Sequence, residues 1–328
     1  MTNVVVTKTP LRISFLGGGT DIDYFYKKHD GAVLSAAINK YVYVTVKKYS
    51  KLYKTKFRLN YSITENTNDI EKIKNNIIRE CLKVAKIDFP IYVSVVSDIP
   101  AGSGLGGSSS VTVGLLKALY ELKGKKITSK KLYDLACEIE IKRLKQPIGK
   151  QDQFPAVYGG MNFIEFKKNG VVKYKKILLE KFNAKLFSNS TLLWTQSTRS
   201  ANGELKFQKK NFKKNEESLL KIKKNLYDFK SESKFKNIEL KKFGSYINFS
   251  WIEKSKLIRS SNFKYNEKFF KLKKYNFYGA KILGAGAGGF WYFLGKKKDL
   301  DTLTKKFKSI IFLKIDISNH GSQVICKN

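Results

Sequence analysis

The sequence predicts an α+β fold built from two domains, and three observations lead to this prediction. The chain has 328 residues and is 42% hydrophobic, which is enough for two hydrophobic cores. Its first half opens with strand patterns and continues with helix patterns, an order typical of a sheet covered by helices on one side. From residue 203 to residue 275 the chain becomes lysine-rich with helical periodicity. We therefore place an N-terminal domain at residues 1–185 and a C-terminal domain at residues 186–328.

The net charge of +37 is compatible with a nucleic-acid partner, but the kind of basic residue argues against one. Only six of the 64 basic residues are arginine, and the lysines are spread along the whole chain. Nucleic-acid-binding proteins usually concentrate their charge and use arginine for bidentate contacts. The abundance of Lys, Asn, Ile, Tyr and Phe is typical of an AT-rich genome. We expect no specific nucleic-acid partner, and a basic nucleic-acid-binding protein remains the distant alternative.

No segment is typical of a membrane or secreted protein. The sequence contains no run of 18 apolar residues, and its start lacks the basic and then apolar regions of a signal peptide. The three cysteines, Cys81, Cys137 and Cys326, are scattered, which indicates a reducing compartment and no metal cluster. We therefore expect a cytoplasmic protein that does not associate with a membrane.

The first strand is expected at residues 4–15, with an interruption at Pro10. The turn Leu16–Asp21 follows, and its three glycines indicate either positive φ angles or the close approach of another group. Asp21 ends this turn, and an aspartate can accept several hydrogen bonds from sugar hydroxyls. The elements expected next are two strands and a helix, at residues 31–40, 41–47 and 69–86.

The most specific pattern is the glycine- and serine-rich segment Pro100–Ser110. It lies between a strand pattern at residues 91–98 and a helix pattern at residues 111–120. A strand, a glycine loop and a helix in this order can hold phosphate, because glycine N–H groups approach an anion closely and the helix N-terminus adds free donors. The dinucleotide-binding fingerprint fits the glycine spacing alone, since no second strand ending in an acidic residue follows. A Walker lysine is also absent.

Two further groups of acidic residues follow this loop. A helix is expected at residues 128–144, with Ser129 as its N-cap. Glu138 and Glu140 flank its apolar stripe on opposite sides, and helical geometry alone does not decide which of them faces a cleft. Asp152 lies between two glutamines and close to aromatic residues, which suits an ordered and partly buried carboxylate.

The second half of the chain holds one more glycine-rich loop. A hairpin is expected around residues 161–177, and a strand followed by a polar loop at Leu192–Ser200. The segment Gly279–Phe290 then leads into the apolar strand pattern of Trp291–Leu294.

Four segments together resemble the GHMP kinase superfamily, which includes galactokinase, homoserine kinase and mevalonate kinase. They are Pro10–Asp21, Pro100–Ser110, the segment around Asp152, and Gly279–Phe290. The segments Pro10–Asp21, Ile38–Tyr41 and Ile148–Gln153 resemble the branch of bacterial D-glycero-D-manno-heptose 7-phosphate kinases and L-fucokinases. The resemblance covers nearly the whole chain. It implies the GHMP kinase fold, with the phosphate loop at a helix N-terminus in a deep cleft between the domains.

The resemblance also implies a role for each matching residue. Asp152 matches the catalytic aspartate, and Arg12 matches the arginine beside the reacting hydroxyl. Ser108 and Glu140 best match the residues that bind Mg²⁺. The residues implied for the ATP phosphate loop are Gly102, Ser103, Gly104, Leu105, Gly106, Gly107, Ser108 and Ser109. The residues expected at the sugar are Gly18, Gly19, Thr20, Asp21, Lys40 and Gly286.

One departure from the branch is visible, since Gly107 stands where the branch usually has a serine. A glycine keeps the backbone donors of the loop but removes a hydroxyl. The sequence does not decide which residues hold a substrate phosphate, and Lys40, Arg199 and Ser200 are the candidates.

The implied activity is that of an ATP- and Mg²⁺-dependent kinase acting on the anomeric O1 of D-glycero-D-manno-heptose 7-phosphate. The product would feed nucleotide-activated heptose for surface polysaccharide such as lipopolysaccharide or capsule. The alternative within the same fold is an unphosphorylated sugar such as L-fucose, while the triple glycine disfavours a mevalonate-type kinase. The expected partners are ATP and a small sugar phosphate, and the expected state is a monomer or homodimer.

Overall fold

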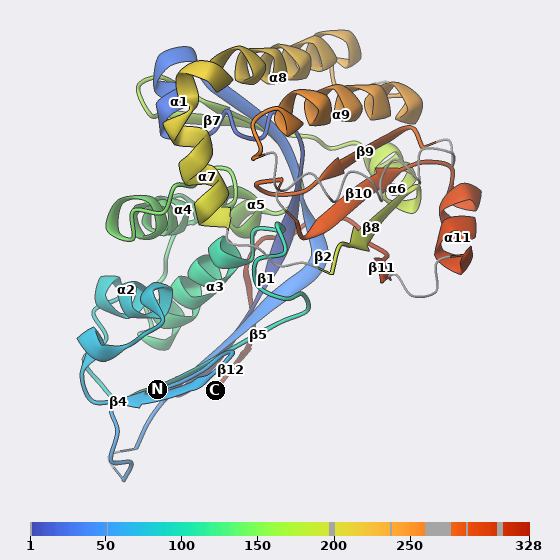
Figure 1. The fold of residues 1–328 in the computed structure, drawn as a ribbon. Helices are drawn as coiled ribbons and strands as arrows, with labels where there is room; N and C mark the ends of the chain where they lie inside the picture. The colour runs from blue at the N-terminus through green and yellow to red at the C-terminus, as the bar shows by residue number, and fades with distance from the viewer. Residues whose placement is uncertain are drawn as a thin grey trace.

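The computed structural model contains two β-sheets with helices packed around them (Figure 1). It describes residues 2–50, 52–196, 201–236, 238–259, 277–286, 288–306 and 311–328. Arg199 and Ser200, two of the candidates for a substrate phosphate, lie outside the described residues. Within the described part of the chain, no helix is long and apolar enough to cross a membrane.

The larger sheet has eight strands and carries most of the N-terminal half. Its strand order is β12-β1-β2-β5-β3-β4, and β6 and β7 extend it from the first part of β2. The strands are β1 (Val4–Leu16), β2 (Gly31–Lys48), β3 (Phe57–Asn60), β4 (Thr64–Thr67), β5 (Ile91–Ser97), β6 (Met161–Phe166), β7 (Val172–Lys176) and β12 (Gln323–Lys327).

Two predictions about these strands were wrong. The strands expected at residues 31–40 and 41–47 are one continuous strand, β2, which pairs with β6 at its start and with β5 at its end. The change of partner cannot be recognised from the alternation of side chains. The first strand also continues through Pro10, where the pairing of β1 with β2 shifts its register between Pro10 and Leu11. Such a shift accommodates a residue that has no backbone N–H to donate.

The helices of the N-terminal half begin and end differently from the predictions. The helix expected at residues 69–86 is a 3₁₀ turn, η1 (Ile70–Lys72), followed by α2 (Asn76–Val84), because the Asn75 side chain caps α2 by accepting from the Ile78 N–H. The helix expected at residues 128–144 is α4 (Ser129–Cys137) followed by a π-helix, η2 (Glu138–Arg143). Its N-cap is Thr128 and not Ser129, since the Thr128 side chain accepts from the Lys131 N–H.

Helix α3 (Gly107–Leu122) packs against the centre of the larger sheet and fixes the position of the glycine-rich loop before it. Most of its apolar side chains are buried, among them Val113, Leu115, Leu116 and Leu119, and Gly114 allows it to approach β1 closely. A Cβ added to Gly114 would lie 2.6 Å from the Thr9 Oγ1. The Thr7 hydroxyl donates to the Gly114 carbonyl at 3.0 Å. Two further helices of this half are α1 (Asp23–His29) and α5 (Gln153–Tyr158).

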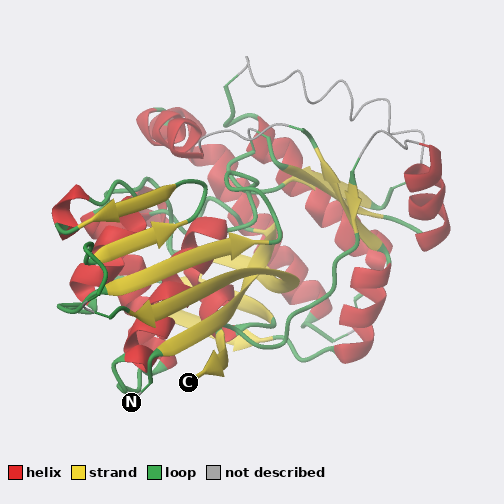
Figure 2. Cartoon of the chain, turned by 90° about the horizontal axis from the view of Figure 1, so that it is seen from below, coloured by secondary structure: helices red, strands yellow, loops and turns green. Residues whose placement is uncertain are grey.

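The smaller sheet has four strands in the order β11-β8-β10-β9, and Figure 2 shows it apart from the larger sheet. The strands are β8 (Ser190–Trp194), β9 (Gly279–Ile282), β10 (Phe290–Leu294) and β11 (Phe312–Leu313). The helices of this half are α6 (Glu180–Ser188), α7 (Ala201–Lys210), α8 (Phe212–Ser233), α9 (Leu240–Ser255) and α11 (Lys297–Lys306).

The domain boundary at 185/186 stays a prediction. The strand pairing shows, however, that the C-terminal residues belong to the larger sheet and not to the smaller one. The last strand, β12, pairs with β1, so the chain returns to the larger sheet after completing the smaller one. The two termini accordingly lie close together in both views (Figures 1 and 2). The hydrophobic core is also shared, because the ring of Phe15 at the end of β1 contacts the rings of Phe187, Phe243 and Tyr292.

Candidate active site

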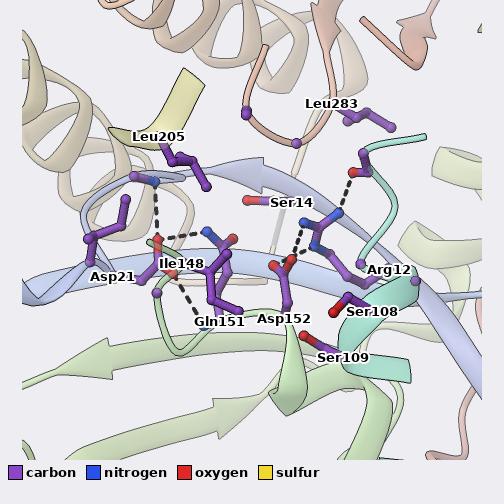
Figure 3. A pocket seen from close by; sticks show the side chains of 18 of the residues that line it. Arg12, Ser14, Asp21, Ser108, Ser109, Ile148, Gln151, Asp152, Leu205 and Leu283 are labelled. Carbon is purple, nitrogen blue, oxygen red and sulfur yellow. Dashed lines mark hydrogen bonds and ion pairs between the residues drawn. The ribbon is translucent and has the colours of Figure 1, made fainter. Parts of the chain in front are cut away.

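A cavity of about 290 Å³ lies where the predicted motifs meet (Figure 3). Its wall is formed by β1, the turn after β1, the loop Gly102–Ser109, the segment around Asp152 and the second glycine loop. Helices α7 and α9 add side chains from the other half of the chain. The four segments that the sequence singled out are therefore adjacent in space.

Arg12 and Asp152 form a bidentate ion pair in this cavity. The Arg12 Nε donates to Asp152 Oδ1 at 2.8 Å, and its Nη2 donates to Oδ2 at 2.6 Å. Arg12 Nη1 donates to the carbonyl of Gly104 at 2.6 Å, so one guanidinium connects the carboxylate to the glycine loop (Figure 3). The Arg12 side chain is 6% exposed and that of Asp152 is 20% exposed. The carboxylate is thus fixed in orientation and still reachable from the cavity.

The loop Gly102–Gly107 has the conformation of an anion-binding loop. Gly102, Gly104 and Gly106 have φ angles of 73°, 82° and 77°, a region that residues with a Cβ rarely adopt. Gly106 is the N-cap of α3, and no side chain caps this helix. Ser108, Ser109 and Ser110 lie inside the first turn of the helix. The first N–H groups of a 16-residue helix therefore point toward the cavity with the positive end of the helix dipole.

Leu105 differs from the other residues of this loop. It is completely buried and does not line the cavity. Its carbonyl accepts from the Arg12 N–H at 2.9 Å. Leu105 anchors the loop to β1, whereas the other seven predicted loop residues line the cavity.

The second glycine loop packs directly on the first. A Cβ added to Gly284 would lie 2.6 Å from the Gly104 Cα, and one added to Gly289 would lie 2.1 Å from the Ser103 carbonyl oxygen. These approaches require glycine, because both contacts are to backbone atoms that cannot move independently. Gly286, which was expected at the sugar, does not line the cavity. A Cβ at Gly286 would instead meet Ile258 at 2.5 Å, which places this residue against apolar side chains.

Glu140 faces the phosphate loop, and Glu138 does not. The Glu140 carboxylate is completely buried and accepts from the hydroxyls of Ser108 at 2.6 Å and Ser109 at 2.8 Å, and from the Gln153 amide at 2.7 Å. Glu138 instead pairs with Arg143 at 2.8 Å, with its side chain 39% exposed. An α-helical periodicity did not decide which of the two glutamates faces the cleft. Both lie in a π-helix, whose wider turn changes the direction in which their side chains leave the axis.

The electrostatic state of Glu140 follows from its burial. Loss of hydration raises the pKa of Glu140 to about 7, although its three hydrogen bonds act in the opposite direction. A buried carboxylate with a raised pKa is stabilised by a nearby cation. Glu140 does not itself line the cavity, and Ser108, which does, separates it from the open space.

Asp21 lies at the other end of the cavity and is almost fully buried. Its Oδ1 accepts from the Gln151 side-chain amide at 2.7 Å and from the Gly19 N–H at 3.2 Å, and its Oδ2 accepts from the Gln151 N–H at 3.2 Å (Figure 3). Burial raises the pKa of Asp21 to about 6, and the charge of Asp152 adds to this effect. The arrangement presents a fixed acceptor to a ligand hydroxyl.

Three further residues expected at the sugar do not line the cavity. Thr20 is completely buried, and its hydroxyl donates to the carbonyls of Gly17 and Ala32, so it holds the turn together. Lys40 does not line the cavity either. It lies in the irregular stretch of β2 between Ile38 and Tyr41, where the register with β1 shifts. Gly18 lies just behind the wall, next to Ser14 and Lys254.

Several polar residues of the cavity were missed by the sequence reasoning. Lys281 is buried and donates to the carbonyls of Ser14 and Phe15 at 2.9 Å each, and burial lowers its pKa well below the usual value. Lys254 is also buried and donates to the Gly284 carbonyl at 2.7 Å. Among so many lysines, neither gave a signal. Ser14 could have been found, because it lies two positions after Arg12 and therefore on the same face of β1.

Comparisons with known proteins agree with this geometry. Residues 71–160 match the family described as GHMP kinases N terminal domain. The chain is 32% identical over 303 residues to the D-glycero-alpha-D-manno-heptose 7-phosphate kinase of Campylobacter jejuni, and the match covers 88% of each chain.

Two solved structures resemble the whole chain. A D-glycero-D-manno-heptose 1-phosphate kinase from Bacteriodes thetaiotaomicron has a TM-score of 0.78 at 22% identity, covering 98% of this chain and 99% of that one. A putative sugar kinase from Campylobacter jejuni has a TM-score of 0.71 at 25% identity, covering 100% of this chain and 99% of that one. The likeness confirms the predicted α+β fold with two domains.

Proposed function

Because the chain belongs to the GHMP kinase family, we propose that it transfers the γ-phosphoryl group of ATP to the anomeric O1 of D-glycero-D-manno-heptose 7-phosphate. The chain is an ATP-dependent phosphotransferase of the sugar-kinase type, as its relatives are. The observation that supports this particular sugar is the 32% identity, over 88% of both chains, to an enzyme named for it. That name specifies the alpha anomer, which we propose as the acceptor here. The product would be the 1,7-bisphosphate, made in the cytoplasm for surface polysaccharide.

The phosphate groups of ATP would lie at the N-terminus of α3. The uncapped N–H groups of Gly107, Ser108 and Ser109 and the backbone of the preceding glycines provide donors there without a lysine. Since the transition state of phosphoryl transfer is loose and anionic, fixed donors and good positioning do most of the catalytic work.

Asp152 would orient the sugar O1–H and accept its proton as the bond between O1 and the γ-phosphorus forms and the bond to the ADP oxygen breaks. Its bidentate pair with Arg12 fixes the carboxylate, and Arg12 also carries positive charge to the place where the phosphoryl group passes. An anomeric hydroxyl is more acidic than an ordinary alcohol, so a weak base is sufficient.

Ser108 and Glu140 would hold Mg²⁺ with the phosphate oxygens of ATP. When bound, Mg²⁺ neutralises the charge of the β- and γ-phosphates. Both side chains offer oxygen ligands, 2.6 Å apart, and the raised pKa of Glu140 is consistent with a carboxylate that lacks a counter-charge. In the described part of the chain, no group of three or more His, Cys, Asp or Glu residues could hold a metal. Mg²⁺ is usually bound by one or two carboxylates and by substrate phosphates.

Asp21 and Gln151 would bind hydroxyls of the sugar, with the Gly19 N–H holding the Asp21 carboxylate in place. These residues lie on the far side of the Arg12–Asp152 pair from α3 (Figure 3). A sugar bound there has its reacting hydroxyl between Asp152 and the phosphate groups. The proposed reaction needs ATP and the sugar phosphate and no nucleic acid. We expect the protein to be a monomer or homodimer.

The test is ADP release from Mg·ATP with a panel of acceptors. The panel contains D-glycero-D-manno-heptose 7-phosphate, mannose 6-phosphate, L-fucose, galactose, mannose and buffer alone. We expect turnover on heptose 7-phosphate and little on the free sugars. Turnover on L-fucose or another free sugar, with none on heptose 7-phosphate, would refute the substrate while leaving the kinase chemistry intact.

A further inference from the structure

A group of polar atoms in the cavity converges on one point beside Gly18. If Gly18 carried a Cβ, that atom would lie 3.1 Å from the Ser14 Oγ, 3.6 Å from the Lys254 Nζ and 4.0 Å from the Gln151 Nε2. These three side chains come from β1, α9 and the segment before α5, which are distant in the sequence. Their polar ends therefore enclose a small space next to Asp21.

Two buried atoms of this group have no hydrogen-bond partner among the residues that the structure describes. They are the Ser14 Oγ and the Gln151 Oε1. The Ser14 residue is 7% exposed, so water from the bulk does not hydrate it freely. Buried polar atoms are nearly always paired, and leaving one unpaired costs about 1–3 kcal/mol. The unpaired atoms indicate that a ligand completes this site.

Lys254 is the cation of the cavity that has the most remaining capacity to bind an anion. Arg12 is bonded to both oxygens of Asp152, and Lys281 donates to two carbonyls. Lys254 donates to one carbonyl, that of Gly284, and an ammonium group has three donors. In the part of the chain that the structure describes, no carboxylate forms an ion pair with Lys254.

Gly18 itself is not required by the backbone. Gly17 and Gly19 have φ angles of 80° and 102°, but Gly18 is not among the residues with positive φ. A Cβ at Gly18 would lie 3.1 Å from the Ser14 Oγ, which is tighter than an ordinary contact. Glycine therefore lets the turn pack closely behind the Ser14 hydroxyl and the Lys254 ammonium, which line the cavity.

We propose that Lys254 and Ser14 hold the phosphate group of the sugar substrate in the part of the cavity that they line next to Asp21. This inference rests on the proposed function, because it requires an acceptor that is already phosphorylated. The Lys254 ammonium and the Ser14 hydroxyl donate to phosphate oxygens, while the Gln151 Oε1 accepts from a sugar hydroxyl. Lys254 is thus a specificity-determining residue supplied by the C-terminal half of the chain.

The place of this subsite distinguishes the phosphate of the sugar from that of ATP. Ser14 lies two residues beyond Arg12 along β1, about 7 Å further toward the turn that ends at Asp21. The ATP phosphates are expected at the N-terminus of α3, on the other side of the Arg12–Asp152 pair. Asp21 is the carboxylate whose charge acts most strongly on Lys254, ahead of Asp152. The subsite therefore belongs to the sugar end of the cavity.

The test compares Lys254→Met with Lys256→Met in steady-state kinetics on heptose 7-phosphate and on the unphosphorylated heptose. Lys256 lies on the same helix end, and its side chain is 53% exposed and paired with Glu253, so its replacement is the matched control. For Lys254→Met we expect KM for heptose 7-phosphate to rise about 10- to 100-fold, as for loss of a charge-assisted hydrogen bond. The preference for the phosphorylated over the unphosphorylated sugar should fall by the same factor. Lys256→Met should stay within about twofold of the wild type.

Two outcomes would overturn the inference. An equal fall of kcat on both sugars would assign Lys254 to the transferred phosphoryl group of ATP, and an unchanged preference would remove it from substrate recognition. If the wild type itself turns over free sugars and not heptose 7-phosphate, the proposed function fails together with the inference. Wild-type turnover on heptose 7-phosphate with an unchanged preference in the variant means that the inference alone has failed.

A second variant covers the case in which Lys254→Met does not fold. Gly18→Ala adds one methyl group at a position without a positive φ, and the new Cβ, 3.1 Å from the Ser14 Oγ, would displace that hydroxyl. We expect a rise in KM of about tenfold for heptose 7-phosphate, larger than the rise for the unphosphorylated heptose. An equal effect on both sugars would contradict the subsite.

Discussion

Asp21→Asn should make the protein more stable above pH 7 while it weakens sugar binding. Asp21 is 1% exposed, and burial raises its pKa from 3.8 to about 6. At pH 8 the carboxylate is charged in the folded and in the unfolded chain, and the folded chain bears the cost of keeping that charge away from water. A shift of roughly 2 pKa units corresponds to about 3 kcal/mol. Asparagine has no charge and avoids this cost.

Part of that gain is lost again through hydrogen bonding. Asparagine can accept from the Gln151 side-chain amide, as Asp21 does, but its NH₂ group would face the Gln151 N–H that now donates to Oδ2 at 3.2 Å. One lost hydrogen bond costs about 1 kcal/mol. Lys254 also loses a nearby negative charge. A net gain of about 1–2 kcal/mol at pH 8 remains.

The stability gain of Asp21→Asn should depend on pH in a defined direction. A raised carboxyl pKa means that the folded chain binds the proton more tightly, so the cost is present above the folded pKa and fades as the pH falls from about 6 toward 3.8. The advantage of Asp21→Asn should therefore shrink by about 2 kcal/mol between pH 8 and pH 4.5.

Urea denaturation at several pH values measures this difference directly. Asp23→Asn is the matched control, because the Asp23 side chain is 43% exposed and its replacement should change stability by less than about 0.5 kcal/mol. A variant at position 21 that is less stable than the wild type at pH 8 would refute the reasoning. So would a gain that does not shrink in acid.

Three other substitutions test the remaining parts of the site, and a fourth, on α7, is a control for the third. Asp152→Asn should lower kcat by about 10²–10⁴-fold with ATP binding nearly unchanged, and a variant within tenfold of the wild type would remove Asp152 from the chemistry. Ser108→Ala should raise the Mg²⁺ concentration needed for half-maximal activity, and an unchanged Mg²⁺ titration would count against Ser108 as a ligand. Gly289→Ala should destabilise the protein by more than about 2 kcal/mol in thermal or urea denaturation, because its φ is +93° and the new Cβ would lie 2.1 Å from the Ser103 carbonyl oxygen. Gly203→Ala on α7, where a Cβ meets nothing within 4 Å, should instead stabilise by about 0.5–1 kcal/mol, and the opposite order of the two would contradict the packing argument.

The elements that the sequence predicted best are those whose function depends on local backbone geometry. The loop Gly102–Ser109 was recognisable because positive φ angles, a preceding strand and a following helix all leave local signals. Asp152 and Asp21 were found because each stands in a short segment of unusual composition. The structure brings all of them to one cavity, although their catalytic roles remain proposals.

What the sequence could not predict depends on contacts between distant segments. Lys254 and Lys281 are buried in the cavity, but nothing distinguishes them from the many exposed lysines of this chain. Lys40 does not line the cavity, and its expected place at the sugar came from the resemblance and not from a spacing argument. The sequence did not show which of Glu138 and Glu140 faces the loop, because the angular positions of an α-helix do not apply where the chain forms a π-helix.

The packing of the two glycine loops explains why the site needs both halves of the chain. Gly104, in the phosphate loop, has its Cα against Gly284 and its carbonyl bonded to Arg12. The loop is thus held on one side by the N-terminal sheet and on the other by backbone from the second loop. The contact with Gly284 is made by main-chain atoms, whereas Arg12 holds the Gly104 carbonyl through its guanidinium, so the position of the loop depends on how closely the halves approach and on this one buried side chain. The C-terminal glycines therefore help to fix the position of the proposed phosphate loop, and Lys254, bonded to the Gly284 carbonyl, couples the proposed sugar-phosphate subsite to that same contact.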